Sequence, residues 1–345
     1  MSAIPATMRA MFLESERADL GQAIRALRVR ELDVPRPGGG EVLVRVEAAP
    51  CNPSDLLVLT GASGRPKTLP TVPGWEASGV VVAAGRGLLP RLLHGRRVAC
   101  GSATHGFGTW AEYFVAKANG CIPLRKAISF EQGATILVNP VTARAMLHEA
   151  RTEGHKAGVQ SAAGSQLGRY LRMIAERADF PLIHLVRRAD QAAALVAGGA
   201  PYVLCTSEPD FPAQLRRAID ETGATVAFDA VGGFLATHLL KVLPEGGEVI
   251  SYGLLSSEPV GVDPADLIFG TKSLRGFFLA DWAARQTLWR LWRTTQAVQK
   301  DLAKQAFATD VAIRAGFEDW PAALERYQVE QSAGKPLLVP QHSRS

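Results

Sequence analysis

The pattern of apolar and polar residues changes once along this chain. In the first 125 residues, Glu41–Ala49 alternates apolar and polar positions, as a strand with one buried face does. Gly79–Ala84 and Arg97–Cys100 are further short β-type runs, and clusters of glycine and proline separate them. This spacing predicts a small antiparallel barrel.

From about Ser129 onward, the pattern predicts alternating strands and helices. Helices are expected at Phe130–Leu137 and Pro140–Glu149, and Ser273–Leu279 is expected to be an edge strand. Ala283–Lys304 reads as one long helix and Leu337–Val339 as a last strand. Between these lie strands Gly158–Ser161, Leu182–Val186, Tyr202–Leu204, Thr225–Asp229 and Glu248–Tyr252, with helices at 166–178, 190–198, 209–222 and 233–242. This order predicts an α/β fold with a doubly wound parallel sheet.

Composition narrows the class of protein. A chain of 345 residues, 47% hydrophobic and 21% charged, predicts two ordinary globular domains. The net charge of +5 is scattered, and the locally basic Arg86–Arg97 is expected to be a solvated loop, so an anionic small ligand is favoured over nucleic acid. No apolar stretch reaches the roughly 18 residues of a membrane-spanning helix. Four widely spaced cysteines indicate reduced thiols and a cytoplasmic protein.

A turn rich in small residues lies where the first strand of the α/β region meets its helix. Such a turn lets backbone N–H groups and a helix N-terminus approach a pyrophosphate. The candidate contacts are Ala163, Gly164, Ser165, Gln166, Leu167 and Gly168. Arg187 and Arg188 follow the next strand, where an arginine meets a ribose 2′-phosphate, so NADPH is predicted rather than NADH. The alternative is an ordinary tight turn with small residues for packing.

Five short motifs carry a resemblance to a known family. They are N-P-S-D at 52–55, P-G-W-E at 73–76, N-P-V-T-A at 139–143, F-D-A-V-G-G at 228–233 and Y-G at 252–253. In this order the chain resembles the medium-chain dehydrogenase/reductase superfamily, and within it the zinc-free quinone oxidoreductase and 2-enoyl-thioester reductase branch. The resemblance implies a GroES-like β-barrel catalytic domain of residues 1–128 and 283–345, and a Rossmann NADPH-binding domain of residues 129–282.

No metal is expected. Asn52, Pro53 and Trp75 stand where the alcohol dehydrogenases of the superfamily carry zinc ligands, and none of these side chains ligates zinc. Cys51 lies one place away without a partner cysteine or histidine. Alcohol dehydrogenase chemistry is therefore disfavoured, because it needs a Lewis acid.

Two residues are predicted to be catalytic. The resemblance implies that Asn52 lies near the nicotinamide or the acceptor oxygen, as catalytic residue and cofactor contact; the alternative is a turn in which Ser54 or Asp55 caps the next helix. Ser63 stands where similar enoyl-thioester reductases carry a proton-donating tyrosine. A serine hydroxyl is a poor general acid, so Ser63 is either a weak donor or a surface loop residue.

The remaining candidate cofactor contacts each have an alternative. Thr142 could touch the nicotinamide ribose or pack in the core, and Lys335 could face the cofactor or the solvent. Tyr252 and Gly253 end a parallel strand, at the edge where ligands bind. The aromatic residues Phe277 and Phe278 could wall an apolar pocket together with Trp282, or be core residues.

The predicted function is an NADPH-dependent, zinc-independent oxidoreductase that transfers hydride to a quinone or an α,β-unsaturated carbonyl. The alternatives are a 2-enoyl-CoA or acyl-carrier-protein thioester reductase, and a non-catalytic NADPH-binding protein. A homodimer or homotetramer is expected, because pairing between two copies would cover the apolar edge strand Ser273–Leu279; the alternative is that the following helix buries this strand.

Overall fold

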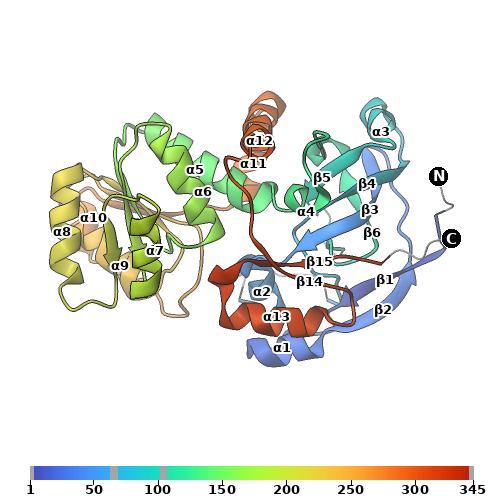
Figure 1. Cartoon of the computed structure of the whole chain (residues 1–345), viewed down its shortest axis with the longest axis horizontal. Coiled ribbons are helices and arrows are strands. Elements are labelled where there is room, and N and C mark those ends of the chain that lie inside the picture. The colour runs from blue at the N-terminus through green and yellow to red at the C-terminus, as the bar shows by residue number, and fades with distance from the viewer. Residues whose placement is uncertain (1–3, 63–68, 102–106, 342–345) are drawn as a thin grey trace. The chain divides into compact units, whose positions relative to one another are not determined.

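The computed structural model describes residues 4–62, 69–101 and 107–341, and the chain forms two compact units (Figure 1). Unit 1 comprises Met1–Val138 and Thr287–Ser345, and unit 2 comprises Asn139–Gln286. The sequence predicted the divisions at 128/129 and 282/283. Helix α4 (Phe130–Gly133) packs on the sheet of unit 1 and therefore belongs to that unit. The first division consequently falls after α4 and not before it. None of the described helices is long and apolar enough to cross a membrane.

Unit 1 is built on one curved sheet. Its strand order is β14-β15-β3-β4-β5-β7, with β6 also pairing β3 and a separate β1–β2 pair. All of these pairs are antiparallel except β14–β15. The strands are β1 (Thr7–Phe12), β2 (Arg28–Asp33), β3 (Glu41–Pro50), β4 (Glu76–Ala84), β5 (Arg97–Gly101), β6 (Tyr113–Lys117), β7 (Ile122–Pro123), β14 (Val311–Ala315) and β15 (Lys335–Leu338).

The core of unit 1 is formed by apolar residues of the sheet and of the helices α1 (Leu20–Ala26), α2 (Pro53–Leu59), α3 (Leu88–Leu93) and α13 (Trp320–Val329). Trp110 and Trp320 meet edge to face, with ring centroids 5.2 Å apart, and both are fully buried. Gly79 lets β4 approach β3, because a Cβ there would collide with the Arg45 carbonyl. The unit also contains the helices α4 and α12 (Leu288–Ala303).

Three predictions of local structure were wrong. Residues 86–97, expected to form a loop, contain helix α3 and the first residue of β5. The helix predicted at Phe130–Leu137 ends at Gly133, and a wide helical turn at Leu137–Val141 follows, since Pro140 lacks an N–H. Ala283–Lys304 is divided between α11 (Leu279–Ala284) and α12, and the Thr287 hydroxyl caps the start of α12.

Unit 2 is a doubly wound sheet of six parallel strands. Their order is β10-β9-β8-β11-β12-β13, which numbers 3-2-1-4-5-6 from the first strand of the unit. The order reverses between β8 and β11, and in such sheets a dinucleotide binds at the carboxyl ends of the strands at this point. The strands are β8 (Gly158–Gln160), β9 (Leu182–Val186), β10 (Val203–Cys205), β11 (Val226–Asp229), β12 (Glu248–Ser251) and β13 (Ser273–Gly276).

Helices link successive strands of unit 2, and the predicted strand-helix alternation is confirmed. Val159, Ile183, Ala227 and Leu239 are among the residues of its apolar core. The helices are α5 (Thr142–Thr152), α6 (Gln166–Glu176), α7 (Ala189–Ala197), α8 (Phe211–Thr222), α9 (Gly233–Val242), α10 (Pro264–Ile268) and α11.

Arg275 on the edge strand β13 joins three elements of unit 2. Its guanidinium lies 2.8 Å from a carboxylate oxygen of Glu248 and 3.0 Å from oxygens of both Glu149 and Glu153. Burial raises the pKa of Glu248, but contacts from His155 and Arg275 outweigh it and hold this pKa at about 2. The cluster therefore fastens β13 to β12 and α5 through a carboxylate that is ionised at neutral pH.

Replacing this arginine is expected to destabilise unit 2 in a pH-dependent way. Arg275→Met leaves three neighbouring carboxylates without their cation, so we expect a loss of about 2 kcal/mol in unfolding free energy at pH 7. The folded-state pKa of Glu248 lies below its ordinary value of 4.5, so the stabilisation is complete above that value and disappears as the pH falls toward 2. Urea unfolding at pH 7 and pH 3 measures both effects.

Arg314→Met is the matched control, because Arg314 forms an exposed ion pair with Glu131 from a strand of unit 1. Its loss should cost at most about 1 kcal/mol. Equal losses for the two variants would contradict a special role for Arg275.

Candidate active site

The register between two strands of unit 1 brings Lys335 to Asn52. Strands β15 and β3 are antiparallel, with Leu337 opposite Pro50. Continuing this register places Lys335 opposite Asn52, and the Cys51 N–H donates to the Pro336 carbonyl at 3.2 Å. Two residues that are 283 positions apart in the chain therefore meet because the last strand pairs with the third.

The turn that carries Asn52 is held on both sides. Asn52 precedes α2 with Pro53 at the first helical position, and its N–H donates to Asp55 Oδ2 at 2.7 Å. The Trp110 indole donates to the Pro50 carbonyl at 3.0 Å. The predicted capping role of Asp55 is thus present, and it orients Asn52.

The side chain of Asn52 lies between a buried cation and a buried carboxylate. Its Oδ1 accepts a hydrogen bond from Lys335 Nζ, and its Nδ2 donates to Glu76 Oε1 at 3.0 Å. Glu76 Oε2 also accepts the N–H groups of Leu137 and Val138, each at 3.0 Å. Asn52, Glu76 and Lys335 are 0%, 1% and 2% exposed.

We call Asn52, Glu76 and Lys335 the buried relay. The sequence left open whether Lys335 faces the cofactor or the solvent. Its burial excludes the solvent. Glu76 was not among the predicted site residues, although it ends the P-G-W-E motif, because nothing in that motif shows which side chains surround it.

Burial opposes both charges of the buried relay. Burial lowers the pKa of Lys335, whereas the nearby Glu76, Cys51 and Asp55 raise it. Burial raises the pKa of Glu76, whereas Lys335 and the three N–H donors lower it. Burial is the largest cause for both groups, so the pKa of Glu76 lies above its ordinary value and that of Lys335 below, and the contacts offset burial only in part. Burial also raises the pKa of the Cys51 thiol, which disfavours a thiolate.

These residues do not fit a zinc ion. The Lys335 ammonium donates a hydrogen bond to the Asn52 carbonyl oxygen, and both Glu76 oxygens accept N–H groups. Lys335 brings a positive charge to the place where a metal would need anionic or neutral donors. The geometry supplies fixed hydrogen-bond donors and a cation in place of a Lewis acid.

In unit 2, the turn between β8 and α6 has the form of a dinucleotide-binding turn. Ala162 has a positive φ of 49°, and the Ser165 hydroxyl caps α6 by accepting the Gly168 N–H at 3.0 Å. A Cβ on Gly168 would lie 2.7 Å from the Ala163 carbonyl oxygen, so only glycine lets the helix approach the turn. The first-turn amides of α6 have no carbonyl partner within the helix, which suits a phosphate.

A serine–aspartate pair joins the two strands at the point where the sheet order reverses. Ser161 Oγ donates to Asp229 Oδ1 at 2.7 Å and accepts the Ala230 N–H at 2.8 Å. The same carboxylate accepts the N–H groups of Val231 and Gly232. Asp229 follows the strand in the F-D-A-V-G-G motif, which is the signal that could have identified it.

Tyr252 and Gly253 lie at the carboxyl end of β12, as predicted. The Tyr252 hydroxyl is buried and has no hydrogen-bond partner among the described residues. Burial and the Asp229 charge raise the pKa of Tyr252, so this hydroxyl remains a neutral donor. A Cβ on Gly253 would lie 2.5 Å from the Ala230 carbonyl oxygen. A buried hydroxyl without a protein partner at this edge fits a bound cofactor.

The two arginines after β9 have different surroundings. Arg188 forms two hydrogen bonds with the Asp190 carboxylate, at 3.0 and 2.9 Å. Arg187 is exposed, and its guanidinium has no hydrogen bond or ion pair with the described residues. Arg187 is therefore the better placed of the two to bind a phosphate.

The other predicted contacts are placed as follows. Thr142 is buried at the first position of α5. Phe277 is buried against Trp282, with ring centroids 6.4 Å apart, whereas Phe278 is exposed. Ala163 is buried, and Gln166 and Leu167 form the first turn of α6 with Gly164 just before it. Ser63 lies outside the described residues.

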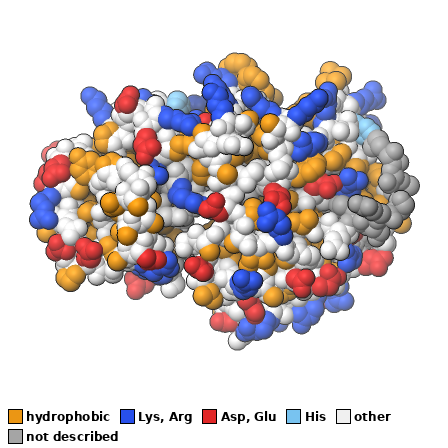
Figure 2. Space-filling model, in the orientation of Figure 1, with side chains coloured by type: hydrophobic (Ala, Val, Ile, Leu, Met, Phe, Trp, Pro, Cys, Tyr) orange, Lys and Arg blue, Asp and Glu red, His pale blue; other side chains and the backbone are white. Residues whose placement is uncertain are grey.

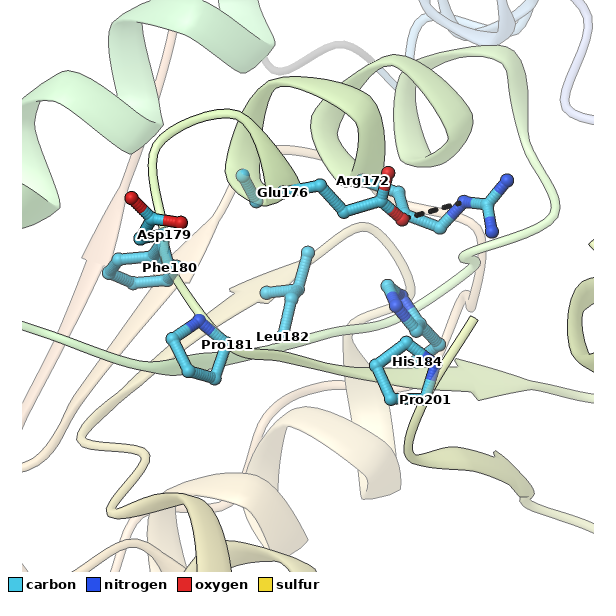
Figure 3. A pocket seen from close by; sticks show the side chains of 9 residues that line it. Arg172, Glu176, Asp179, Phe180, Pro181, Leu182, His184 and Pro201 are labelled. Atoms are coloured by element: carbon cyan, nitrogen blue, oxygen red, sulfur yellow. Dashed lines mark ion pairs between the residues drawn. The ribbon is translucent and has the colours of Figure 1, made fainter. Parts of the chain in front are cut away.

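A hollow of about 300 Å³ lies elsewhere on unit 2 (Figure 3). It is lined by the second half of α6 and by Pro181 and Leu182, at the amino end of β9, whereas ligands bind at carboxyl ends in such sheets. Its buried His184 accepts a hydrogen bond from Gln160 Nε2 at 2.8 Å, and burial lowers the pKa of His184 to about 4. A neutral imidazole with this partner supports the sheet and is not a candidate acid or base.

Family models match both units of the chain. The model described as an alcohol dehydrogenase GroES-like domain matches residues 38–126, and the one described as a zinc-binding dehydrogenase matches residues 167–294. Together they cover more than half of the chain. The chain belongs to the medium-chain dehydrogenase/reductase family of oxidoreductases, in its zinc-free quinone oxidoreductase and enoyl reductase branch.

Individual relatives agree with this assignment. The chain is 32% identical to the mitochondrial enoyl-[acyl-carrier-protein] reductase of Mus musculus over 267 residues, which are 76% of this chain and 71% of that protein. It is 33% identical to a Mesorhizobium loti protein titled as an NADPH:quinone reductase, with a TM-score of 0.91 over 98% of this chain and 100% of that one. A mycobacterial protein complexed with NADPH is 23% identical and shares the fold, with a TM-score of 0.80 over 96% of this chain and 100% of that one.

Removing the cation of the buried relay is expected to destabilise unit 1. Lys335→Met leaves the Glu76 carboxylate buried without its counter-charge and should cost about 3 kcal/mol in unfolding free energy. The double variant Lys335→Met/Glu76→Gln should lose less than the sum of the two single variants, because it removes both charges. Urea unfolding at pH 7 of all three variants measures the coupling.

The exposed Lys156→Met serves as a control and should change stability by less than about 0.5 kcal/mol. Additive losses in the double variant would show that Lys335 and Glu76 do not interact.

Proposed function

We propose that this protein is an NADPH-dependent, zinc-independent oxidoreductase that reduces quinones or α,β-unsaturated carbonyl compounds. The buried relay of Asn52, Glu76 and Lys335 carries the proposal, because it provides a fixed hydrogen-bond donor and a cation but no free ligand for a metal. Quinones and conjugated carbonyls delocalise the incoming negative charge over their own oxygen, so they react without a Lewis acid.

Asn52 is proposed to hydrogen-bond the acceptor oxygen. Its amide nitrogen has two hydrogens, and one of them is donated to Glu76. Lys335 on the carbonyl oxygen of the same amide polarises it, which strengthens the remaining N–H as a donor. A bound reduced nicotinamide supplies the hydride, and the relay supplies a fixed donor for the charge that develops on the acceptor.

NADPH is proposed as the cofactor because arginines, and no preceding acidic residue, follow β9. The partnerless guanidinium of Arg187 makes it the principal contact of the 2′-phosphate. Arg187→Ala should weaken NADPH binding roughly 10–100-fold and leave NADH binding unchanged, since a charge-assisted contact with the 2′-phosphate is lost.

Arg188→Ala is the control for this prediction, and it should have a smaller effect because Arg188 is already paired with Asp190. Fluorescence titration of the unmodified protein and both variants with each cofactor measures the six dissociation constants. Tighter binding of NADH than of NADPH by the unmodified protein would refute the cofactor assignment.

Reduction of a 2-enoyl thioester is the second candidate function. The similarity to enoyl-[acyl-carrier-protein] reductases favours it. Ser63 in place of a tyrosine opposes it, because serine donates a proton poorly. A protein that binds NADPH without reducing any acceptor would support the third, non-catalytic alternative.

Asn52→Ala is expected to lower kcat for a quinone or an enone roughly 100–1,000-fold, because one donor to the developing oxyanion is lost. NADPH affinity should change little. The assay uses a quinone, an enone, a 2-enoyl thioester and, in reverse, a primary alcohol, each with and without a chelator. Circular dichroism controls for folding of the variant.

Three results would count against this assignment. Loss of activity on chelation would contradict the zinc-independent mechanism. Weaker NADPH binding with unchanged kcat would make Asn52 a cofactor contact only. Loss of thioester turnover in Ser63→Ala, from a protein that otherwise reduces thioesters readily, would favour the second function.

We also propose that β13 pairs with its counterpart in a second copy of the chain. Among the described residues β13 pairs only with β12, and the nearby Ile268 and Phe269 are strongly exposed. Light scattering should therefore give the mass of a dimer or a multiple of it. The double variant Ile268→Asp/Phe269→Asp should be monomeric, and the equally exposed control Val329→Asp should not. A monomeric unmodified protein would refute the pairing.

A further inference from the structure

Unit 1 carries a surface of uniform positive charge that the proposed function does not use. It consists of three segments, residues 86–96, 117–126 and 288–300. They contain nine lysines and arginines and neither aspartate nor glutamate, although the whole chain has 33 acidic residues. We call these segments the basic face; its cations are Arg86, Arg91, Arg96, Lys117, Arg125, Lys126, Arg290, Arg293 and Lys300.

The three segments contact one another in series. Helix α3 packs on the short helix Ala118–Gly120, and α12 is bound to the following residues. The Gln299 side chain accepts the Arg125 N–H at 2.9 Å and donates to the Pro123 carbonyl at 3.2 Å. Helices α3 and α12 both lie along the upper edge of unit 1 in Figure 1.

The cations of the basic face are available for a partner. None of the nine forms an ion pair with another described residue, whereas many arginines elsewhere in the chain do. Eight of the nine are exposed, and Arg290 is half-buried. Their charges therefore add to one another and are not neutralised locally.

Large apolar side chains project from the basic face at two places. On α3, Leu88 and Leu92 are 76% and 62% exposed, and Leu89 is exposed as well. On α12, Leu288 and the stacked pair Trp289 and Trp292, whose ring centroids are 4.8 Å apart, are exposed. In Figure 2, hydrophobic atoms cap two projections on the upper edge, with Lys and Arg side chains beside them.

We propose that the basic face docks unit 1 on the surface of an anionic phospholipid bilayer. Protein surfaces that lie in the membrane interface typically carry leucine and tryptophan side chains surrounded by arginine and lysine. The apolar residues form projections and not a groove, so they suit a bilayer, which yields to the inserted side chains. A nucleic acid could neutralise the cations, but it offers no apolar phase for the exposed leucines of two helices.

Binding combines burial of apolar side chains with attraction to anionic headgroups, and each contribution is small and reversible. Near an anionic surface, each lysine or arginine contributes roughly fivefold to the partition coefficient.

The test is flotation of the full-length protein with lipid vesicles at an ionic strength of ~0.15 M. Vesicles contain phosphatidylcholine alone, or equal parts of phosphatidylcholine and phosphatidylglycerol. The unmodified protein should float with the anionic vesicles and not with the neutral ones. The triple variant Arg86→Gln/Arg91→Gln/Arg96→Gln should bind about 100-fold more weakly.

A matched control separates the basic face from net charge. The triple variant Arg36→Gln/Arg151→Gln/Arg217→Gln removes three exposed arginines elsewhere and should bind as the unmodified protein does. The double variant Leu88→Ser/Leu92→Ser should bind at least roughly tenfold more weakly, because the inserted side chains are lost. Equal losses of vesicle binding in the two triple arginine variants would overturn the proposal.

A spectroscopic readout tests insertion directly. Lipids brominated in the acyl chain should quench tryptophan fluorescence of the bound protein, and Trp289→Phe/Trp292→Phe should remove most of this quenching. No flotation with anionic vesicles would overturn the proposal. Binding of an acidic protein or an RNA to the basic face, without binding to vesicles, would also overturn it.

Discussion

The hydrogen bonds from Lys335 to Asn52 and from Asn52 to Glu76 join three segments of unit 1 that are far apart in the sequence. Lys335 comes from the last strand, Asn52 from the turn before α2, and Glu76 from the start of β4. Glu76 also holds the N–H groups of Leu137 and Val138 at the end of the first part of the unit. Because all three side chains are buried, loss of any one leaves a charge or an amide without a partner.

A buried ion pair need not stabilise a fold more than apolar residues of the same size would. What the buried relay gives is a fixed direction for the Asn52 amide. The Asp55 carboxylate sets the backbone of Asn52, and the two charges set its side chain. The remaining amide hydrogen is therefore oriented before any ligand binds, which is the condition for effective stabilisation of a developing charge.

Local patterns predicted most of the fold and part of the site. The strand Leu182–Val186 has the predicted bounds, because an apolar run between turn residues is a local signal. The turn at Ala163–Gly168 was found from its small residues. The burial of Lys335 depends on the pairing of β15 with β3, and the place of Glu76 depends on the pairing of β4 with β3. Neither was predicted, because strand pairing is not encoded locally. The pairing of Arg188 with Asp190 was also not predicted: Arg188 was identified as a candidate contact, but its carboxylate partner was not.

The discontinuous composition of unit 1 has a consequence for protein synthesis. Unit 2 lies entirely within the chain, so a ribosome completes it before β15 emerges. Until then Asn52 and Glu76 have been translated, but their cation has not, and the carboxylate lacks its counter-charge. The nascent unit 1 must therefore keep this region hydrated or protonated, and its interior closes only after β15 has emerged from the ribosome.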